Sequence, residues 1–347
     1  MNNNNNYNGW LLNEFETVKQ NNLKVFSTFA CGGGSSMGYK LAGFTIEAAN
    51  DIDPIMRKHY EKNLKPKLFI EKPVKELLNT TLPDQLFNLD ILDGSPPCST
   101  FSMAGNREKD WGQKKYFREG QQEQVLDDLF FDFIDLGNKL QPKVIVAENV
   151  KGLMSGNAKG YCKLIFEQLK RSGYKPQMFL INAAFCNVPQ ARERVFIIAQ
   201  RNDLNKPLLQ INTNNKTISA QQSFNTLNET KILKHYLSGR TKQLWHLTKQ
   251  GKSFANSCKK LNGKSSWFNS RVIHPDLPAP TITAACNAYH WEEPRRLTEN
   301  EYKRLGTFPD DYYFYNYQMA SYLTGMSVPP KMMQIVAEAI RDQWLND

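Results

Sequence analysis

One cysteine lies in a stretch of chain stiff enough to hold a reactive group in place. Cys98 follows Pro96 and Pro97 in the run DGSPPCSTFS, residues 93–102. Each proline fixes φ and removes a backbone donor, so the segment before the sulfur joins neither a helix nor a sheet ladder. A thiolate held there could act as a nucleophile. The alternative is a buried cysteine that packs as a small hydrophobe, which is the more usual role of a free thiol.

An acid and two arginines form a second set of candidates. Glu148 follows the apolar run 144–147, where burial favours the neutral acid and suits it to hold or deliver a proton. A capping or loop-bonding acid is the alternative. Arg192 and Arg194 alternate in QARER, residues 190–194, and extended backbone would project both to one side. They could donate to a carbonyl oxygen or a phosphate, or form an ion pair with Glu193 or a neighbour.

A glycine-rich loop provides the third set. The run FACGGGSSMG, residues 29–38, has the spacing Gly-x-Gly-x-x-x-Gly, which differs from the usual dinucleotide fingerprint. Glycines let backbone approach a ligand closely, although a plain tight turn needs them too. Asp51 follows about 20 residues later, where an acid can bind ribose hydroxyls. For Asp53 we favour a helix N-cap, because Pro54 comes next.

Short apolar runs that alternate with helical patterns must position these groups. The sequence predicts an α/β fold, with a parallel sheet covered by helices and chemistry at the carboxyl ends of its strands. Asp93-Gly94 is expected to end the fourth strand. The predicted strands cover 25–29, 44–50, 68–70, 89–92, 144–147, 178–184 and 195–199. One predicted helix ends near Leu41, a second begins at Pro54, and the others cover 125–140, 161–169 and 331–345.

The positive charge of the chain is concentrated in one segment. The net charge is +10, and residues 201–271 hold 13 Lys or Arg against two acids, Asp203 and Glu229. A solvated face usually mixes signs, so this segment predicts a polyanionic partner, with nucleic acid as the leading candidate. Its aromatic residues include Trp245, Phe254 and Phe268.

The remaining composition narrows the class of protein. The chain has 347 residues, 40% of them hydrophobic, and six cysteines with no Cys-x-x-Cys pair. We expect reduced thiols in a cytosolic compartment, no structural zinc and no membrane span. Residues 1–8 are rich in asparagine and lack the pattern of a signal peptide.

Taken together and in order, these motifs resemble those of the DNA cytosine-5 methyltransferase family, of the bacterial restriction-modification type. The similarity runs from about Val25 to Ile340. It rests on motifs in a specific order: the glycine loop, Pro96-Pro97-Cys98, Glu148-Asn149-Val150, the QARER run, Arg271 with Pro280-Thr281, and GMSVPP at residues 325–330.

The resemblance implies a mechanism. Carbon 5 of cytosine is a poor nucleophile until a thiolate adds to carbon 6, and Cys98 matches the cysteine that does so. Glu148 resembles the acid that bonds ring nitrogen 3 and the exocyclic amine. Arg194 matches the arginine on the base carbonyl, and Arg192 supports the pocket. The base has to leave the duplex, which costs a few kcal/mol.

The resemblance also implies a cofactor, S-adenosyl-L-methionine, with S-adenosyl-L-homocysteine as product and no metal. The resemblance implies cofactor-binding roles for the glycine loop, for the acid that binds ribose, for an apolar residue that contacts adenine and for the C-terminal motif that closes the pocket. The implied cofactor residues are Phe29, Ala30, Gly33, Gly34, Asp51, Ile52, Pro96, Leu129, Ser327 and Val328.

The fold implied is the Rossmann-like, mostly parallel sheet of S-adenosylmethionine-dependent methyltransferases, with helices on both faces and a smaller target-recognition domain. We expect a flexible tail at 1–22, a catalytic and cofactor domain at 23–200, target recognition at 201–317, and a helix at 318–347 that returns to the catalytic domain. The expected partner is double-stranded DNA. The protein is expected to be a cytoplasmic, nucleoid-associated monomer without membrane contact, and a cognate restriction endonuclease would act separately.

Three positions depart from the family pattern. Cys31 stands where the loop usually has its first glycine, the acid that contacts the adenine amine is missing near residues 72–74 although Glu71 is close, and Met326 replaces an asparagine. Two alternatives stay open: a tRNA cytosine-5 methyltransferase and a catalytically inactive DNA-binding homologue. The glycine spacing disfavours a nicotinamide enzyme.

Overall fold

The computed structural model describes residues 9–97, 114–115, 124–125, 128–155, 158–227, 232–285 and 287–346. Contacts divide the chain into two compact units. We call one the sheet unit, comprising Phe15–Asn182, Glu193–Thr213 and Met333–Asp347, and the other the basic unit, comprising Met1–Glu14, Ala183–Arg192 and Asn214–Met332. The domain functions and boundaries expected from the sequence stay predictions.

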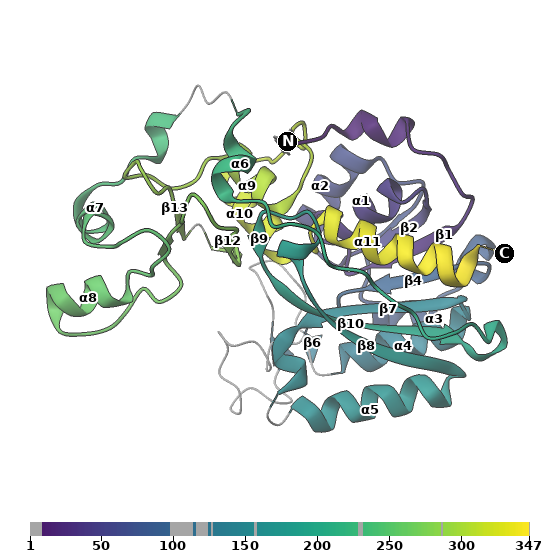
Figure 1. The fold of residues 1–347 in the computed structure, drawn as a ribbon. Helices are drawn as coiled ribbons and strands as arrows, with labels where there is room; N and C mark the ends of the chain where they lie inside the picture. Colours follow the sequence, from purple (N-terminus) through teal and green to yellow (C-terminus); the bar gives the residue numbers. More distant parts are fainter. Residues whose placement is uncertain are drawn as a thin grey trace. The chain divides into compact units, whose positions relative to one another are not determined.

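A seven-stranded sheet forms the centre of the sheet unit (Figure 1). Its strand order is β3-β2-β1-β4-β7-β10-β8. Neighbours from β3 to β7 are parallel, whereas β10 is antiparallel to both β7 and β8, so β10 alone runs against the other six. The strands are β1 (Lys24–Thr28), β2 (Thr45–Asn50), β3 (Phe69–Ile70), β4 (Ile91–Gly94), β7 (Val144–Val150), β8 (Tyr174–Asn182) and β10 (Glu193–Arg201). The predicted mostly parallel α/β sheet and its final strand pair are confirmed.

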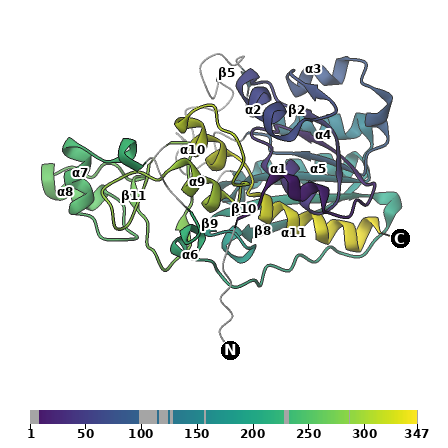
Figure 2. The same ribbon diagram turned by 90° about the horizontal axis from the view of Figure 1, so that it is seen from above.

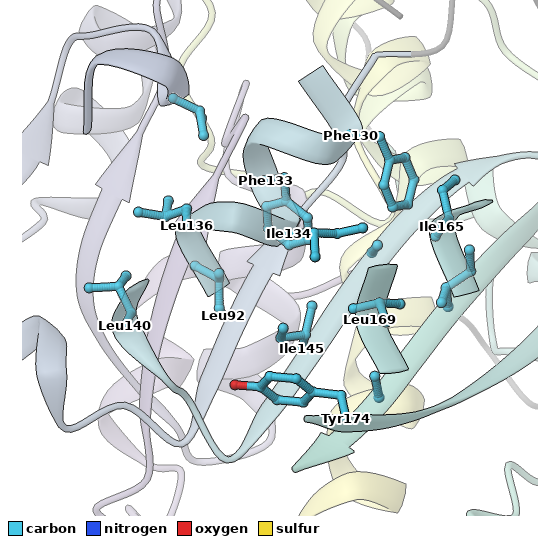
Figure 3. Packing of buried hydrophobic residues seen from close by; sticks show 14 of the residues in the cluster. Leu92, Phe130, Phe133, Ile134, Leu136, Leu140, Ile145, Ile165, Leu169 and Tyr174 are labelled. Atoms are coloured by element: carbon cyan, nitrogen blue, oxygen red, sulfur yellow. The ribbon is translucent and has the colours of Figure 1, made fainter. Parts of the chain in front are cut away.

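Side-chain alternation gives the two faces of this sheet different roles. One face carries large apolar residues such as Phe26, Leu92 and Ile145, which pack with Phe133 and Ile165 into the main core (Figure 3). The helices over this face are α3 (Val74–Asn79), α4 (Leu129–Leu140) and α5 (Ala158–Arg171). Burial of this cluster, about 25 cal/mol per Å² of apolar surface, is the main force that holds the sheet in place.

Helices α1 (Gly34–Leu41), α2 (Pro54–Leu64) and α11 (Pro330–Ile340) belong to the rest of the fold. Figures 1 and 2 both show α1 and α11 side by side, and Arg341 just after α11 donates from Nη1 to the carbonyl of Ala42 at 2.7 Å. The predicted helix over 331–345 is confirmed in its first part. Its end differs, because residues Arg341–Leu345 form a π-helical turn.

Two predicted boundaries in the sheet unit are wrong. The helix expected from Val125 begins at Leu129, because Gln124–Val125 (β6) pairs with Lys114–Lys115 (β5) as a short ladder. The fourth strand does not end before Asp93-Gly94. It includes both residues, because Asp93 and Gly94 pair with β1 on one side and with β7 on the other, and Gly94 has no side chain to clash with Phe133.

The basic unit is built from short elements. Its helices are α6 (Ala220–Phe224), α7 (Gly239–His246), α8 (Ala255–Asn262), α9 (Glu299–Gly306) and α10 (Tyr317–Met326), and its strands are β9 (Gln190–Ala191), β11 (Arg271–Val272), β12 (Ala279–Pro280) and β13 (Ala288–Tyr289). A small core of five buried residues joins α7 and α8 to the β11–β13 pair: Leu244, Phe254, Cys258, Val272 and Tyr289. The short 3-10 turns of this unit are Ala183–Phe185 and Ile232–His235. Those of the sheet unit are Asp84–Phe87, Lys151–Met154 and Asn202–Leu204, and the turn Leu12–Glu16 contains residues of both units.

The segment just after the first eight residues is anchored in the basic unit. Trp10 is buried, and its indole Nε1 donates to the carbonyl of Thr307 at 2.8 Å. The described part of the predicted flexible tail therefore has a fixed packing contact. Among the described residues, no helix is long and apolar enough to cross a bilayer.

Candidate active site

Polar side chains collect on the second face of the sheet, at the carboxyl ends of its central strands. Ser27 of β1 pairs with Asp93 of β4, and Asp93 pairs with Val146 of β7. Paired residues share a face, and so do residues two apart, so Glu148 lies on the same face as Asp93. Arg194 of β10 joins them, because Phe196, two residues further, pairs with Glu148.

Glu148 and Arg194 form a buried ion pair. Arg194 Nε lies 2.9 Å from Glu148 Oε1, and their side chains are 13% and 10% exposed. Burial lowers the pKa of Arg194, whereas the negative charge of Glu148 opposes that shift. Glu193 pairs instead with Lys151 at 2.9 Å, on the surface. An ion pair was one of the two predicted roles for these arginines, and Arg194 forms one, with Glu148 and not with Glu193.

Arg192 has other partners. Its guanidinium is 2% exposed and donates to the carbonyls of Ile282, Gly325 and Ser327 at 3.2, 2.9 and 3.2 Å. Arg192 and Arg194 therefore have separate sets of partners, three main-chain carbonyls for Arg192 and the Glu148 carboxylate for Arg194. Arg192 fixes three main-chain positions of the basic unit, and its predicted catalytic role stays a prediction.

The glycine loop connects β1 to α1. Phe29, Cys31 and Gly33 have φ of 50°, 47° and 80°, all in the left-handed region. Gly33 is the N-cap of α1, and a Cβ there would meet Leu64 Cδ1 at 2.3 Å. The loop therefore needs a glycine at that position, and Cys31 adopts a backbone conformation that glycine would adopt without strain. Ala30 and Gly34 are buried in this turn.

Asp51, at the end of β2, organises the same loop. Its Oδ2 accepts from the Cys31 N–H at 2.8 Å, and its Oδ1 accepts from the Asp53 N–H at 2.9 Å. Burial raises the pKa of Asp51 to about 6. Each carboxylate oxygen has a second lone pair, so both can still accept from a ribose hydroxyl. Ile52 is half-buried beside it.

The N-cap prediction for Asp53 is confirmed. Its Oδ1 accepts from the Ile55 N–H at 2.8 Å, with Pro54 as the first residue of α2. Asp53 therefore has a structural role, which leaves Asp51 as the acid available for a ligand.

The segment that leads to Cys98 is held by a neighbouring strand. Asn149 Nδ2 donates to the carbonyl of buried Pro96 at 3.1 Å, and Asn149 Oδ1 accepts from the Val150 N–H at 2.8 Å. Cys98 itself lies outside the described residues. The structure describes the chain up to Pro97 and shows that its last turn is tied to β7.

Three further predicted cofactor residues lie on elements already described. Leu129 is the first residue of α4 and is buried. In the basic unit, Ser327 and Val328 follow α10, and both are buried. The hydroxyl of Ser327 has no hydrogen-bond partner among the described residues. A buried hydroxyl of this kind usually has a partner, which a bound ligand can supply.

Sequence reasoning missed two residues of this site. The residue types alone place Asp93 after the end of a strand and give Asn149 no role of its own. The signal for Asn149 was its place directly after Glu148, because side chains alternate and a polar residue on the opposite face must have its own partner. Asp93 was detectable as an acid within an otherwise apolar strand.

The sheet, the glycine loop at its edge and the acid after β2 define the fold of the S-adenosylmethionine-dependent methyltransferases. Solved structures agree. A putative DNA modification methyltransferase encoded within an E. coli prophage has a TM-score of 0.68 at 20% identity and covers 94% of this chain and 100% of its own. DNMT2 from Spodoptera frugiperda has a TM-score of 0.65 at 18% identity, covering 92% and 99%.

The family follows from the sequence comparisons. Residues 23–342 match the C-5 cytosine-specific DNA methylase family, and the chain belongs to it. Type II methyltransferase M.NgoFVII from Neisseria gonorrhoeae is 30% identical, covering 92% of this chain and 87% of the relative. M.FnuDI from Fusobacterium nucleatum is 29% identical, covering 92% and 94%. The protein is therefore a DNA cytosine-5 methyltransferase.

Proposed function

We propose that the protein transfers a methyl group from S-adenosylmethionine to carbon 5 of a flipped-out cytosine in a specific duplex DNA sequence, through a covalent adduct to Cys98. The observation that carries this proposal is the buried Glu148–Arg194 pair, next to a loop that Asn149 ties down at Pro96. A preformed acid and guanidinium at the carboxyl edge of the sheet suit recognition of a planar base with a carbonyl and an amine.

The residues present fit the cofactor. In the sheet unit, Asp51 has lone pairs left for ribose hydroxyls and Ile52 offers an apolar surface. In the basic unit, taken by itself, the Ser327 hydroxyl lacks a partner among the described residues. Gly33 and Gly34 allow close approach of a ligand to the start of α1. When bound, S-adenosylmethionine supplies an electrophilic methyl group. Phe29, Ala30, Pro96, Leu129 and Val328 complete the proposed cofactor contacts.

The chain's own groups would carry the remaining steps. The Cys98 thiolate adds to carbon 6, while Glu148 holds ring nitrogen 3 and the exocyclic amine, and Arg194 donates to the base carbonyl. Addition makes carbon 5 nucleophilic, so it takes up the methyl group. Loss of the carbon 5 proton and elimination of the thiolate then restore the double bond and release Cys98. Arg192 supports the pocket through main-chain carbonyls.

The basic unit supports DNA as the polymer. Exposed Lys or Arg residues occur before α6, on α7 and α8, and in the segments next to these two helices: Lys216, Lys234, Arg240, Lys242, Lys249, Lys252, Lys259, Lys260 and Lys264. Among them, Lys234 faces Glu299 at 3.5 Å. Side chains of this kind contact phosphates and provide affinity without sequence information.

The aromatic residues of this segment divide into two groups. Phe254 is in the small core and Phe224 stacks on Trp291, whereas Trp267 and Phe268 are exposed. Exposed aromatic rings can stack on unpaired bases, so we assign contacts with the distorted duplex to this second group. The protein is proposed to act on cytoplasmic, nucleoid DNA as a monomer, with a restriction endonuclease acting separately.

One experiment tests the covalent mechanism. Duplex DNA containing 5-fluorocytosine cannot lose a proton from carbon 5 after methyl transfer, so the enzyme should remain attached in a denaturing gel. We expect this adduct with the wild type and with a Cys162→Ala control, and none with Cys98→Ala. Bisulfite sequencing of DNA from expressing cells identifies the target site. Methyl transfer to tRNA in place of duplex DNA, or an adduct with Cys98→Ala, would refute the proposal.

A further inference from the structure

The carboxyl end of β4 carries a buried acid that the proposed mechanism does not use. Asp93 is 2% exposed. Its Oδ2 accepts from Ser27 Oγ at 3.0 Å, and its Oδ1 accepts from Tyr39 OH at 3.3 Å. The Ser35 hydroxyl is a third group near this carboxyl, and it also lowers the pKa of Asp93. These groups are neutral hydroxyls, and among the described residues no Lys or Arg forms an ion pair with Asp93.

These three hydroxyl groups belong to the segments on either side of the glycine loop, which is proposed to bind the cofactor. Ser27 is on β1, directly before the glycine loop, and Ser35 and Tyr39 are on α1, whose first turn follows that loop. Asp93 is also close in sequence to Pro96, whose carbonyl Asn149 holds. One carboxylate therefore connects the start of α1 to the strand from which the Cys98 segment leaves.

The opposite side of this strand end is fixed as well. A Cβ on Gly94 would meet Phe133 Cε2 and Thr28 Oγ1, each at 2.6 Å. Phe133 in turn packs edge-on against Phe29, with ring centroids 6.4 Å apart. Small movements of β4 at this point are therefore transmitted to a residue of the glycine loop.

The charged and titratable groups around Asp93 help to set the pH at which it is protonated. Glu148 contributes a negative charge from β7, and Tyr39 and Tyr60 face it from α1 and α2. Arg194 is engaged by Glu148. Burial, and to a smaller extent Glu148, raises the pKa of Asp93 to about 7, against the three hydroxyl hydrogen bonds that lower it.

We propose that Asp93 is a positioning residue whose ionised form holds the first turn of α1 and the end of β4 in the arrangement that binds the cofactor. The carboxylate accepts from the Ser27 and Tyr39 hydroxyls at once. A protonated acid must donate its own proton, so one hydroxyl has to turn away, and hydrogen bonds to a charged acceptor are about twice as strong as neutral ones. This inference rests on the proposed function, because it takes the glycine loop as the cofactor site.

The consequence is a link between protonation and cofactor binding. If the cofactor favours the ionised form, binding lowers the proton affinity of Asp93 and releases part of a proton, because coupling between two ligands is reciprocal. Replacing one charge-assisted hydrogen bond with a neutral one corresponds to an affinity change of about fivefold. A residue with only a packing role would show neither effect.

The test uses S-adenosylhomocysteine and isothermal titration calorimetry between pH 5.5 and 8.5, in buffers of different ionisation enthalpy. The wild type should bind about fivefold more weakly below pH 7 than above it, and should release protons on binding near neutral pH. Asp93→Asn should lose this proton release. Asp90→Asn is the matched control, because Asp90 lies just before β4 and pairs with Lys143 at 2.8 Å, outside the proposed cofactor site, so this variant should keep the proton release.

Ser27→Ala and Tyr39→Phe provide the second measurement. Each removes a hydrogen bond that lowers the pKa of Asp93, so each should raise the pH at which S-adenosylhomocysteine affinity changes. If Asp93→Asn does not fold, these two variants test the role of Asp93, and an affinity change at the same pH as in the wild type overturns the inference. Proton release in Asp93→Asn equal to that of the wild type overturns it too. Failure of the wild type to bind at any pH would instead refute the proposed cofactor site itself.

Discussion

Removing the charge of Glu148 tests how much of the site is preorganised by its ion pair. Glu148→Gln keeps the shape of the side chain and one hydrogen-bond acceptor, but it leaves Arg194 charged and buried without its partner. Arg194→Met does the reverse and leaves a carboxylate on the same face as Asp93. The double variant removes both charges, so its cost should be lower than the sum of the two single costs.

The magnitude follows from burial and distance. At a charge separation of about 4 Å and an effective dielectric constant of about 20, the pair is worth roughly 4 kcal/mol. Breaking a buried pair from one side typically costs about 3–5 kcal/mol. We expect Glu148→Gln to lower the free energy of unfolding by about 3 kcal/mol, and the double-mutant cycle to give a coupling energy of about 3 kcal/mol.

The assay is urea denaturation of the four proteins at one pH, followed by circular dichroism. The chain supplies a matched control, since Lys151 and Glu193 also lie 2.9 Å apart but are 57% and 42% exposed. The same cycle on that pair should give less than about 1 kcal/mol, because water screens exposed charges. Coupling energies that are equal for the two pairs, or additive costs at Glu148 and Arg194, would refute the reasoning.

Three other predictions follow from single contacts. Asn149→Asp places a carboxylate against the Pro96 carbonyl, so methyl transfer should fall more than S-adenosylhomocysteine affinity, to which Pro96 is only one contact, and an equal loss of both would contradict this. Cys31→Gly should raise the free energy of unfolding by about 1 kcal/mol, because φ of 47° strains a residue with a Cβ; thermal unfolding checks it. Asp93 binds its proton more tightly when folded, so stability should fall as pH rises from about 4 to 7 by on the order of 4 kcal/mol, and Asp93→Asn should flatten this slope in urea titrations across pH.

The sheet could be predicted because its strands are apolar and its helix signals are local. The N-cap at Asp53 and the final strand pair followed from residue types alone. The start of α4 could not be predicted, since the ladder between β5 and β6 depends on a pairing across nine residues that periodicity does not record. Apolar spacing upstream of Leu129 therefore extended the helix too far.

Residues of the site could be predicted where a residue type implies one kind of chemistry. They could not be predicted where the role of a side chain depends on the partners that tertiary packing gives it. The glycine loop and Asp51 could be read from the sequence. The different surroundings of Arg192 and Arg194 could not, because their spacing is symmetrical and only tertiary packing gives one a carboxylate and the other three carbonyls. Asp93 was missed because an acid next to a glycine usually marks a turn.

The hydrogen bonds of Arg192 to main-chain carbonyls have a consequence for how the protein can evolve. Every residue has a carbonyl, so the side chain at Met326, between the acceptors Gly325 and Ser327, can differ from the asparagine that the family has there. Met326 is also 40% exposed. What must persist is the backbone path through Ile282, Gly325 and Ser327. Recombination that replaces only 215–281 with a relative's segment leaves all three acceptors in place, so the hydrogen bonds of Arg192 do not oppose the exchange of that segment.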